Sequence, residues 1–398
     1  MAKINHLDNS INLEDKRVLL RVDFNVPSNN GSITETSRIE KVLPTIKFLI
    51  AKKAKIIIIS HMGRPKGKII PDLSLEPIAK KLKISLNQNV YFSKKTIGTE
   101  TVERSKNISN GEVLLLENLR FHKGEELNSK EFSIELSKNG DIYVNEAFSC
   151  SHREHSSVSE ITKHIESFAG EQLIKEIDTI KMLTENTKKP VSCIIGGSKI
   201  STKIGILNNL LKKMDNIIVV GAMANNFIKY KKFNIGKSIF EKNTENLIKD
   251  LIKEADLNNC KIIIPYDVIV SKNYNLKGQL KNLDSINDSD LILDIGDKTI
   301  DYILKIIDNS KTVLWNGPAG YFEIDEFSKG SEKIAKKIYE NTKNKTLTSI
   351  AGGGDTVAAI NKFDCYGGFT YISTAGGAFL ESLEGKVLPG IKALEKYE

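Results

Sequence analysis

Residues Leu347–Ile360 read LTSIAGGGDTVAAI, and this stretch holds the pattern that decides the fold. An apolar run typical of a buried strand stops at three consecutive glycines, and a helical pattern resumes at Val357. Glycine lets the backbone pass close to a ligand, and the free N–H groups at a helix start attract an anion. Asp355, within the turn, is suited either to cap the helix or to hold a divalent cation that bridges phosphates.

The turn alone does not separate a phosphate-binding loop from a plain connection. It has neither the Gly-Lys-Ser/Thr of a Walker loop nor the GxGxxG of a dinucleotide-binding fold. Its meaning therefore depends on the rest of the chain.

Apolar runs alternate with amphipathic stretches along almost the whole sequence, and this order predicts parallel sheets flanked by helices. The 398 residues are too many for one core and suit two α/β domains, each with a doubly wound, Rossmann-like sheet. An amphipathic pattern from about residue 168 to residue 188, closed by Pro190, predicts a helix that joins the domains. The expected strands are residues 16–22, 55–60, 113–116 and 141–144, then 191–195, 216–220, 261–264, 291–295, 312–314, 347–351 and 370–372.

Composition excludes several classes of protein. The opening residues, MAKINHLDNS, lack the apolar core of a signal peptide, and no apolar run approaches the roughly 18 residues that a membrane span needs. The four cysteines lie far apart without a CxxC pair, which argues against disulfides and against a zinc site. We therefore expect a cytoplasmic protein that does not enter a membrane.

The distribution of basic residues is more informative than the net charge of +8, which fits either nucleic acid or small anions. Most basic residues are lysines, and the arginines all lie at or before Arg153. Arginine grips a phosphate or carboxylate at two points, which lysine cannot do. We therefore expect an anion site in the first half of the chain and a glycine-lined phosphate site in the second.

Polar loops follow most of the expected strands. In the first half these loops carry Asp23 and Asn25, then His61 with Arg64, then Arg120, and then Arg153. Ligands of doubly wound sheets bind outside the carboxyl ends of the strands, so the loops should converge on one site. In the second half, Lys199 and Asn316 occupy loops of the same kind.

Seven motifs, taken together, resemble the phosphoglycerate kinase family nearly from end to end. They are RVDFNVP, SHMGRP, LLENLRF, IIGGSK, WNGPAGYFE, AGGGDTVAA and STAGGAFLESLEGKVLPG, in that family's order and spacing. The resemblance implies reversible phosphoryl transfer from 1,3-bisphosphoglycerate to MgADP, which gives 3-phosphoglycerate and MgATP. It also implies a phosphoglycerate-binding domain (residues 1–170), an interdomain helix (171–189), a nucleotide-binding domain (190–378) and a C-terminal segment (379–398) that crosses back to the first domain.

The resemblance further implies roles for individual residues. Those expected to bind phosphoglycerate are Asp23, Phe24, Asn25, Arg38, His61, Met62, Gly63, Arg64, Arg120 and Arg153. Those expected to bind the nucleotide are Lys199, Lys203, Asn316, Glu323, Gly352, Gly353, Gly354, Asp355 and Thr356, with Asp355 also the Mg²⁺ ligand. Those expected to act on the transferring group are Arg38, Lys203, Gly376 and Gly377.

The chemistry of this reaction agrees with the residue types. Toward ATP consumption the nucleophile is a carboxylate, which is already ionised at neutral pH and needs no general base. Such a transfer depends on positioning, on charge stabilisation and on closure of the two half-sites. We expect a monomer whose partners are these substrates rather than nucleic acid.

Two other functions fit parts of the sequence. The pI of 9.0 is compatible with a nucleic-acid or polyanion binder, although no nucleic-acid-binding motif is present. The α/β layout is compatible with a dinucleotide oxidoreductase, although GxGxxG followed by an acidic residue is missing.

The sequence also departs from the family's pattern. Glu146 stands at a usual Asp, Asp297 at a usual Pro, and residues 149–151 read Ser-Cys-Ser instead of Gly-Thr-Ala. Ala222 and Ala375 replace glycines. These changes remove no charge that the reaction needs, but Glu146 could alter the geometry near Arg153.

Overall fold

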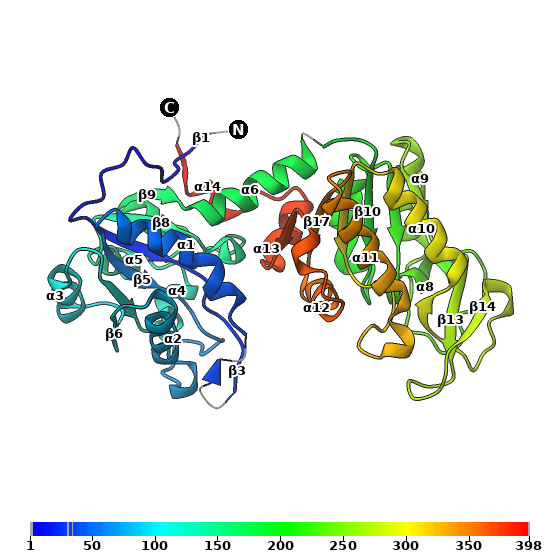
Figure 1. The fold of residues 1–398 in the computed structure, drawn as a ribbon, viewed down its shortest axis with the longest axis horizontal. Coiled ribbons are helices and arrows are strands. Elements are labelled where there is room, and N and C mark those ends of the chain that lie inside the picture. Colours follow the sequence, from blue (N-terminus) through cyan, green and yellow to red (C-terminus); the bar gives the residue numbers. More distant parts are fainter. Residues whose placement is uncertain (1–2, 30–31, 34, 186, 397–398) are drawn as a thin grey trace. The chain divides into compact units, whose positions relative to one another are not determined.

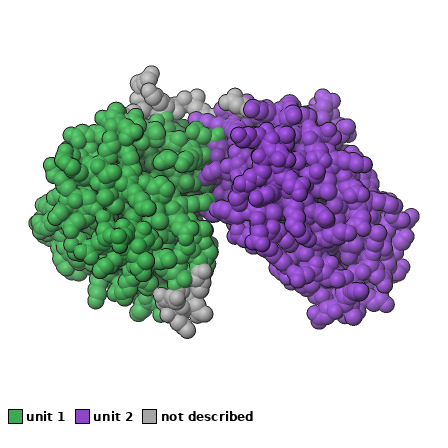
Figure 2. All heavy atoms as spheres, in the orientation of Figure 1, with its two compact units in different colours: residues 1–178, 387–398 green, residues 179–386 purple. Residues whose placement is uncertain are grey.

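The protein is described by a computed structural model, which covers residues 3–29, 32–33, 35–185 and 187–396. Residues 1–2, 30–31, 34, 186 and 397–398, which fall within the expected domain bounds, lie outside these ranges. The chain divides into two compact units (Figure 2): unit 1 comprises residues 1–178 and 387–398, and unit 2 comprises residues 179–386. Each unit is built on its own sheet (Figure 1).

The main sheet of unit 1 has six parallel strands in the order β6-β7-β5-β2-β8-β9. They are β2 (Arg17–Arg21), β5 (Lys55–Ile59), β6 (Val90–Ser93), β7 (Val113–Leu116), β8 (Ile142–Asn145) and β9 (Glu166–Ala169). Successive residues of the central strand β2 point to opposite faces, so that Leu20 and Leu19 enter two different hydrophobic clusters. This double burial explains why the inner strands read as continuous apolar runs.

The two edge strands of this sheet, β6 and β9, were not predicted. Each is short and partly exposed, so neither gives an uninterrupted apolar run. Residues 168 and 169, expected at the start of the interdomain helix, belong to β9 instead. Helix α6 begins at Glu171 and ends at Thr184.

The main sheet of unit 2 also has six parallel strands, in the order β12-β11-β10-β16-β17-β18. They are β10 (Val191–Ile195), β11 (Asn216–Val219), β12 (Lys261–Ile263), β16 (Thr312–Asn316), β17 (Thr348–Gly352) and β18 (Tyr371–Ser373). Trp315 on β16 is fully buried and packs in a hydrophobic cluster with residues of α10 (Asp297–Asn309) and α11 (Lys329–Lys343). Both sheets are therefore the doubly wound parallel sheets that the sequence predicts.

Unit 2 contains a smaller antiparallel sheet that the sequence did not predict. Its strands, in the order β14-β13-β15, are β13 (Asp267–Ser271), β14 (Gln279–Asn282) and β15 (Leu291–Ile295). We expected residues 291–295 in the parallel sheet, which was wrong, because β15 pairs antiparallel with β13. An apolar run marks a strand, but the direction of its partner depends on the connections in the fold.

Helices flank the sheets. In unit 1 and at its boundary they are α1 (Ser37–Ala51), α2 (Glu76–Leu86), α3 (Thr99–Asn107), α4 (Lys123–Glu126), α5 (Lys130–Ser137), α6 and α14 (Pro389–Lys392). In unit 2 they are α7 (Ile204–Leu211), α8 (Gly221–Tyr230), α9 (Glu245–Leu257), α10 (Asp297–Asn309), α11 (Lys329–Lys343), α12 (Gly354–Lys362) and α13 (Gly377–Leu383). Among the described residues, none of the helices combines the length and the apolarity that crossing a bilayer would require.

The C-terminal segment returns to unit 1. Strand β19 (Glu395–Lys396) pairs antiparallel with β1 (Lys3–Ile4), and the Gly390 N–H donates to the Ser151 carbonyl at 2.8 Å. The crossing begins at residue 387, later than the expected 379, because α13 stays in unit 2. The Asn209 amide donates to the Leu383 carbonyl at 2.6 Å and holds α13 there.

Candidate active site

In unit 1, a carboxylate orients an arginine at the carboxyl end of the sheet. Asp23 follows β2, and Arg38 lies in the first turn of α1. Arg38 Nη1 donates to Asp23 Oδ2 at 2.8 Å and to the Asn25 carbonyl at 2.9 Å. The Ser149 hydroxyl donates to the same Asp23 oxygen. The carboxylate thus neutralises and aims Arg38, whose position at a positive helix end is otherwise unfavourable.

A second chain of contacts joins the loops after β2, β5 and β7. The Gly63 N–H donates to Asn25 Oδ1 at 2.9 Å, and Arg120 Nη1 donates to the Gly63 carbonyl at 2.6 Å. Asn118, which the sequence analysis did not single out, is fully buried and binds both the N–H and the carbonyl of Met62. A polar residue inside the apolar motif LLENLRF was the available signal for this supporting role.

The third arginine of this cluster is Arg21, which is buried. Its Nη2 lies 3.3 Å from His61 Nδ1 and 3.6 Å from Cys150 Sγ. Because a guanidinium only donates, Nδ1 of His61 accepts, and the neutral ring carries its proton on Nε2. Burial, reinforced by nearby arginines and opposed by Asp23, holds the pKa of His61 well below its usual range.

The pKa shifts of Asp23 and Arg120 show how the charged groups of this cluster affect one another. Burial alone would raise the pKa of Asp23, but neighbouring His61 and Arg38, with the hydrogen bonds from Ser149 and from the Asn25 N–H, hold that pKa below its ordinary value. Burial, together with the positive charges of Arg153 and Arg21, lowers the pKa of Arg120. Arg120, Arg153 and Arg21 are therefore close enough for their positive charges to repel one another, and a bound anion would relieve that repulsion.

The remaining residues expected to bind phosphoglycerate lie in different environments. The Phe24 and Met62 side chains are buried in the hydrophobic core, so they support the loops from behind. Arg64 is exposed. Arg153 Nε donates to His152 Nε2 at 3.2 Å, and the positive charge of Arg153 contributes to the lowered pKa of His61.

In unit 2, Asn316 ties a lysine to the glycine-rich loop. Its side-chain oxygen accepts from Lys203 Nζ, and its Nδ2 donates to the Gly352 carbonyl at 2.6 Å. The Gly317 N–H donates to the Thr356 hydroxyl at 2.7 Å. Asn316 and Thr356 therefore join the loops after β16 and β17, and both are buried.

The consecutive glycines Gly352, Gly353 and Gly354 differ in how much room each would leave for a side chain. A Cβ at Gly352 would lie 2.4 Å from the Phe379 ring, and one at Gly353 would lie 2.8 Å from Asn316 Nδ2. A Cβ at Gly354 would have no atom within 4 Å. The first two glycines are thus needed for packing, whereas the third opens onto free space at the start of α12.

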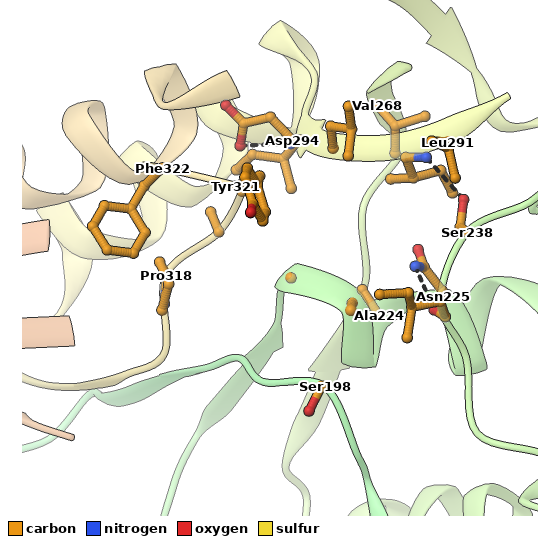
Figure 3. A pocket seen from close by; sticks show the side chains of 18 of the residues that line it. Ser198, Ala224, Asn225, Ser238, Val268, Leu291, Asp294, Pro318, Tyr321 and Phe322 are labelled. Atoms are coloured by element: carbon orange, nitrogen blue, oxygen red, sulfur yellow. Dashed lines mark hydrogen bonds between the residues drawn. The ribbon is translucent and has the colours of Figure 1, made fainter. Parts of the chain in front are cut away.

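A cavity of about 320 Å³ lies next to these loops (Figure 3). Two expected nucleotide ligands, Glu323 and Asp355, line it together with Gly197 and Ser198. Much of the remaining wall is apolar, including Val268, Leu291 and Pro318 (Figure 3). Sequence reasoning missed the apolar wall from β13 and β15, because these strands gave no sign that they border a cavity. The combination of acidic, glycine and apolar groups suits a nucleotide.

The other residues expected in unit 2 lie at loop and helix ends. Lys199 is exposed, next to Ser198 of the cavity wall. Gly376 has φ +51° and directly precedes α13, and Gly377 is the first residue of that helix. Burial lowers the pKa of Lys203 to about 8, although the charge of Asp355 opposes this change. Lys203 and Asp355 therefore interact electrostatically.

Asp355 is the carboxylate of this cavity that the sequence predicts as the Mg²⁺ ligand. Asp355 is exposed in the first turn of α12 and lines the cavity. Within the described ranges, no group of three or more His, Cys, Asp or Glu side chains is arranged to hold a metal. Mg²⁺ often takes only one or two protein carboxylates and completes its shell with phosphate oxygens and water. The residues present fit that mode.

Two doubly wound units, one with an arginine cluster and one with a glycine-walled cavity, define the class as a two-domain α/β phosphotransferase. The family model described as phosphoglycerate kinase matches residues 8–386. The chain belongs to the phosphoglycerate kinase family, and its activity is the phosphoglycerate kinase step of glycolysis.

Individual relatives agree with this assignment. The phosphoglycerate kinase of Orientia tsutsugamushi (strain Boryong) is 46% identical, across 99% of this chain and 98% of that protein. The phosphoglycerate kinase structure from Coxiella burnetii is 39% identical with a TM-score of 0.90, across 98% of this chain and 99% of the other. The structure from Pyrococcus horikoshii OT3 is 31% identical with a TM-score of 0.82, and covers 98% of both chains. Family membership favours the kinase over the polyanion binder and the oxidoreductase.

Proposed function

We propose that unit 1 binds the phosphoglycerate and unit 2 binds the nucleotide, and that the chain transfers a phosphoryl group between 1,3-bisphosphoglycerate and MgADP. The observation that carries this proposal is the cavity of unit 2. Its lining includes Glu323 and Asp355 together with loop glycines such as Gly197 and Gly320. It offers an apolar region to a base, acidic groups to ribose hydroxyls or a metal ion, and helix-start N–H groups to phosphates.

Unit 1 supplies the anion grip. Arg38, Arg120 and Arg153 are the donors to the phosphate and carboxylate of phosphoglycerate, and His61 adds a neutral donor through Nε2. Asp23 and Asn25 orient Arg38 and Gly63 through the contacts described above. Because the acceptor carboxylate is already ionised, these residues need only position it and screen its charge.

Unit 2 supplies the groups that bind the nucleotide and its phosphates. Lys199 and Lys203 bind phosphate oxygens as point charges, and the backbone of Gly352–Gly354 forms a wall that lets phosphates approach. Gly376 and Gly377 present N–H groups to the transferring phosphoryl group. Glu323 binds the ribose. Asp355 would hold Mg²⁺, which neutralises phosphate charge when it is bound.

The transfer step requires both half-sites. We propose that Arg38 and Lys203 stabilise the phosphoryl group from opposite units, after closure excludes water. In this proposal the enzyme works as a cytoplasmic monomer, since each half-site is complete within one chain.

The test is a direct assay. Purified protein is mixed with 3-phosphoglycerate and MgATP, and ADP formation is followed by a coupled reaction. We expect turnover that depends on all three components. Folded protein without turnover above background would contradict the proposal.

A further inference from the structure

The last residue of α12, Lys362, holds the loop that carries Glu323. Its Nζ donates to the Phe322 carbonyl at 2.8 Å, to the Glu323 carbonyl at 3.2 Å and to Asp325 Oδ1 at 2.6 Å. A lysine ammonium group has three donors, so these three acceptors account for all of them. The lysine is therefore fully committed to this loop.

The two carbonyls that Lys362 binds flank the Glu323 Cα. One belongs to the peptide group before this Cα, and the other belongs to the peptide group after it. Because peptide groups are planar, holding both of them fixes φ and ψ, and hence the direction in which Cβ leaves the backbone. The Glu323 side chain is exposed and lines the cavity, so its backbone rather than packing decides where the carboxylate lies.

The other end of α12 borders the same cavity. The helix begins at Gly354, and Asp355 in its first turn lines the cavity together with Glu323. Its 9 residues span roughly 13 Å at 1.5 Å per residue, and a cation at its last residue suits the negative end of the helix dipole. One helix therefore sets the spacing between the proposed Mg²⁺ ligand and the loop of the proposed ribose ligand.

We propose that Lys362 is a positioning residue for the nucleotide, which aims the Glu323 carboxylate at the ribose hydroxyl groups through the two carbonyls that flank Glu323. This inference rests on the proposed nucleotide site in unit 2, in which Glu323 binds the ribose. It adds a residue that lies outside the lining of the cavity and acts on the ribose through Glu323.

Lys336 on α11 provides a matched control. Its side chain is also exposed in part and pairs with a carboxylate, that of Glu332 on the same helix. Neither residue of this pair lines the cavity. Lys336→Met therefore removes a lysine and an ion pair from unit 2 without changing the loop that carries Glu323.

The experiment compares kcat/KM for MgATP with kcat/KM for the Mg²⁺ complex of 2′,3′-dideoxy-ATP, which lacks both ribose hydroxyl groups, with 3-phosphoglycerate as the other substrate. We expect wild type and Lys336→Met to show the same preference for ATP. Lys362→Met should lower that preference about tenfold, the worth of one hydrogen bond. In a Glu323→Ala background, Lys362→Met should lower it no further, because the carboxylate that Lys362 aims is gone.

Structural damage lowers both rate constants together, so only their ratio tests the placement of Glu323. A wild-type ratio in Lys362→Met would overturn the inference. A wild-type ratio in Glu323→Ala, or a further loss of preference in the double variant, would also overturn it.

A second variant covers the case in which Lys362→Met does not fold. Asp325→Ala removes one of the three acceptors, and the Asp325 side chain is 93% exposed. Its loss should lower the preference for ATP about twofold, and an unchanged ratio would again overturn the inference. Folded wild type that turns over neither triphosphate would instead contradict the proposed function.

Discussion

Lys203 Nζ contacts both oxygens of Asn316: it donates to the side-chain oxygen, and it lies 3.4 Å from the main-chain carbonyl. Asn316 in turn binds the Gly352 carbonyl. The Asn316 side-chain amide therefore connects the proposed catalytic lysine with the glycine-rich loop at residues 352–354. The environment that sets the charge of Lys203 therefore depends on the assembly of the loops after β16 and β17.

The pH dependence of the free enzyme should report Lys203. Burial lowers its pKa to about 8, so its positive charge is lost as the pH rises through that value. We expect kcat/KM for MgATP to fall above about pH 8, measured between pH 6 and pH 10. Lys203→Arg, whose side chain does not titrate in this range, should lose the alkaline limb. The same limb in both proteins would assign it to another group.

Arg38→Ala should affect transfer much more than nucleotide binding. Arg38 belongs to unit 1, whereas the nucleotide cavity is lined by unit 2. We expect kcat to fall roughly 100-fold or more, the usual cost of removing one transition-state donor. ADP affinity, measured by calorimetry, should hardly change. Arg38→Lys should recover little activity, because lysine lacks the second donor for a two-point contact. An unchanged kcat in Arg38→Ala would remove this residue from the transfer step.

Asp355→Asn should raise the Mg²⁺ requirement. The amide is neutral and a poorer ligand than a carboxylate, so half-maximal activity should need roughly tenfold more free Mg²⁺ at fixed ATP. Asp364→Asn is a suitable control, since Asp364 is exposed just after the other end of α12 and its positive φ of 54° is well tolerated by Asn. Equal Mg²⁺ curves for Asp355→Asn and wild type would exclude Asp355 as a ligand.

Glu146 should make the stability of unit 1 depend on pH. Its buried carboxylate accepts from the Thr45 hydroxyl and, at 3.0 Å, from the Leu173 N–H of α6. Burial raises its pKa to about 7 from 4.5. Since the folded state holds this proton more tightly than the unfolded state, the resulting stability is complete below pH 4.5 and is lost as pH rises through 7.

Glu146→Gln removes this titration and tests it. Between pH 5 and pH 8, wild type should lose about 2 to 3 kcal/mol of unfolding free energy relative to the variant, measured by urea denaturation. Asp178→Asn, at an exposed position on α6, should track wild type. Parallel pH curves for wild type and Glu146→Gln would show that Glu146 is ionised throughout.

Most of the main architecture could be predicted from local patterns. Runs such as Lys55–Ile59 and Val191–Ile195 are buried on both faces, so their apolar character is uninterrupted and easy to detect. Two segments differ from the prediction. Residues 168 and 169, expected in a helix, belong to the edge strand β9, which lacks such a run. Residues 291–295 form the expected strand, but β15 pairs in another sheet because strand pairing is a long-range property.

The candidate site also has features that the sequence predicts and features that only the tertiary structure shows. The sequence identifies charged and glycine-rich loops by residue type and spacing, as at Arg38 and Asp355. It does not show that Phe24 and Met62 turn into the core, or that the hydrogen bonds of Asn316 and Thr356 tie two loops together. Those outcomes depend on which backbone groups remain unpaired after folding.

By itself, then, the sequence determined the family of this protein and the parallel sheets that it builds, because its motifs and apolar runs are local patterns. The tertiary structure alone decided the division of labour among the three glycines, the proton position on His61 and the contacts of Lys362 with the loop that carries Glu323. The physical reason is that residue type and spacing are local, whereas burial and hydrogen-bond partners come from segments far apart in the chain. Gly352 meets Phe379, and His61 meets Arg21, only after the sheets have formed.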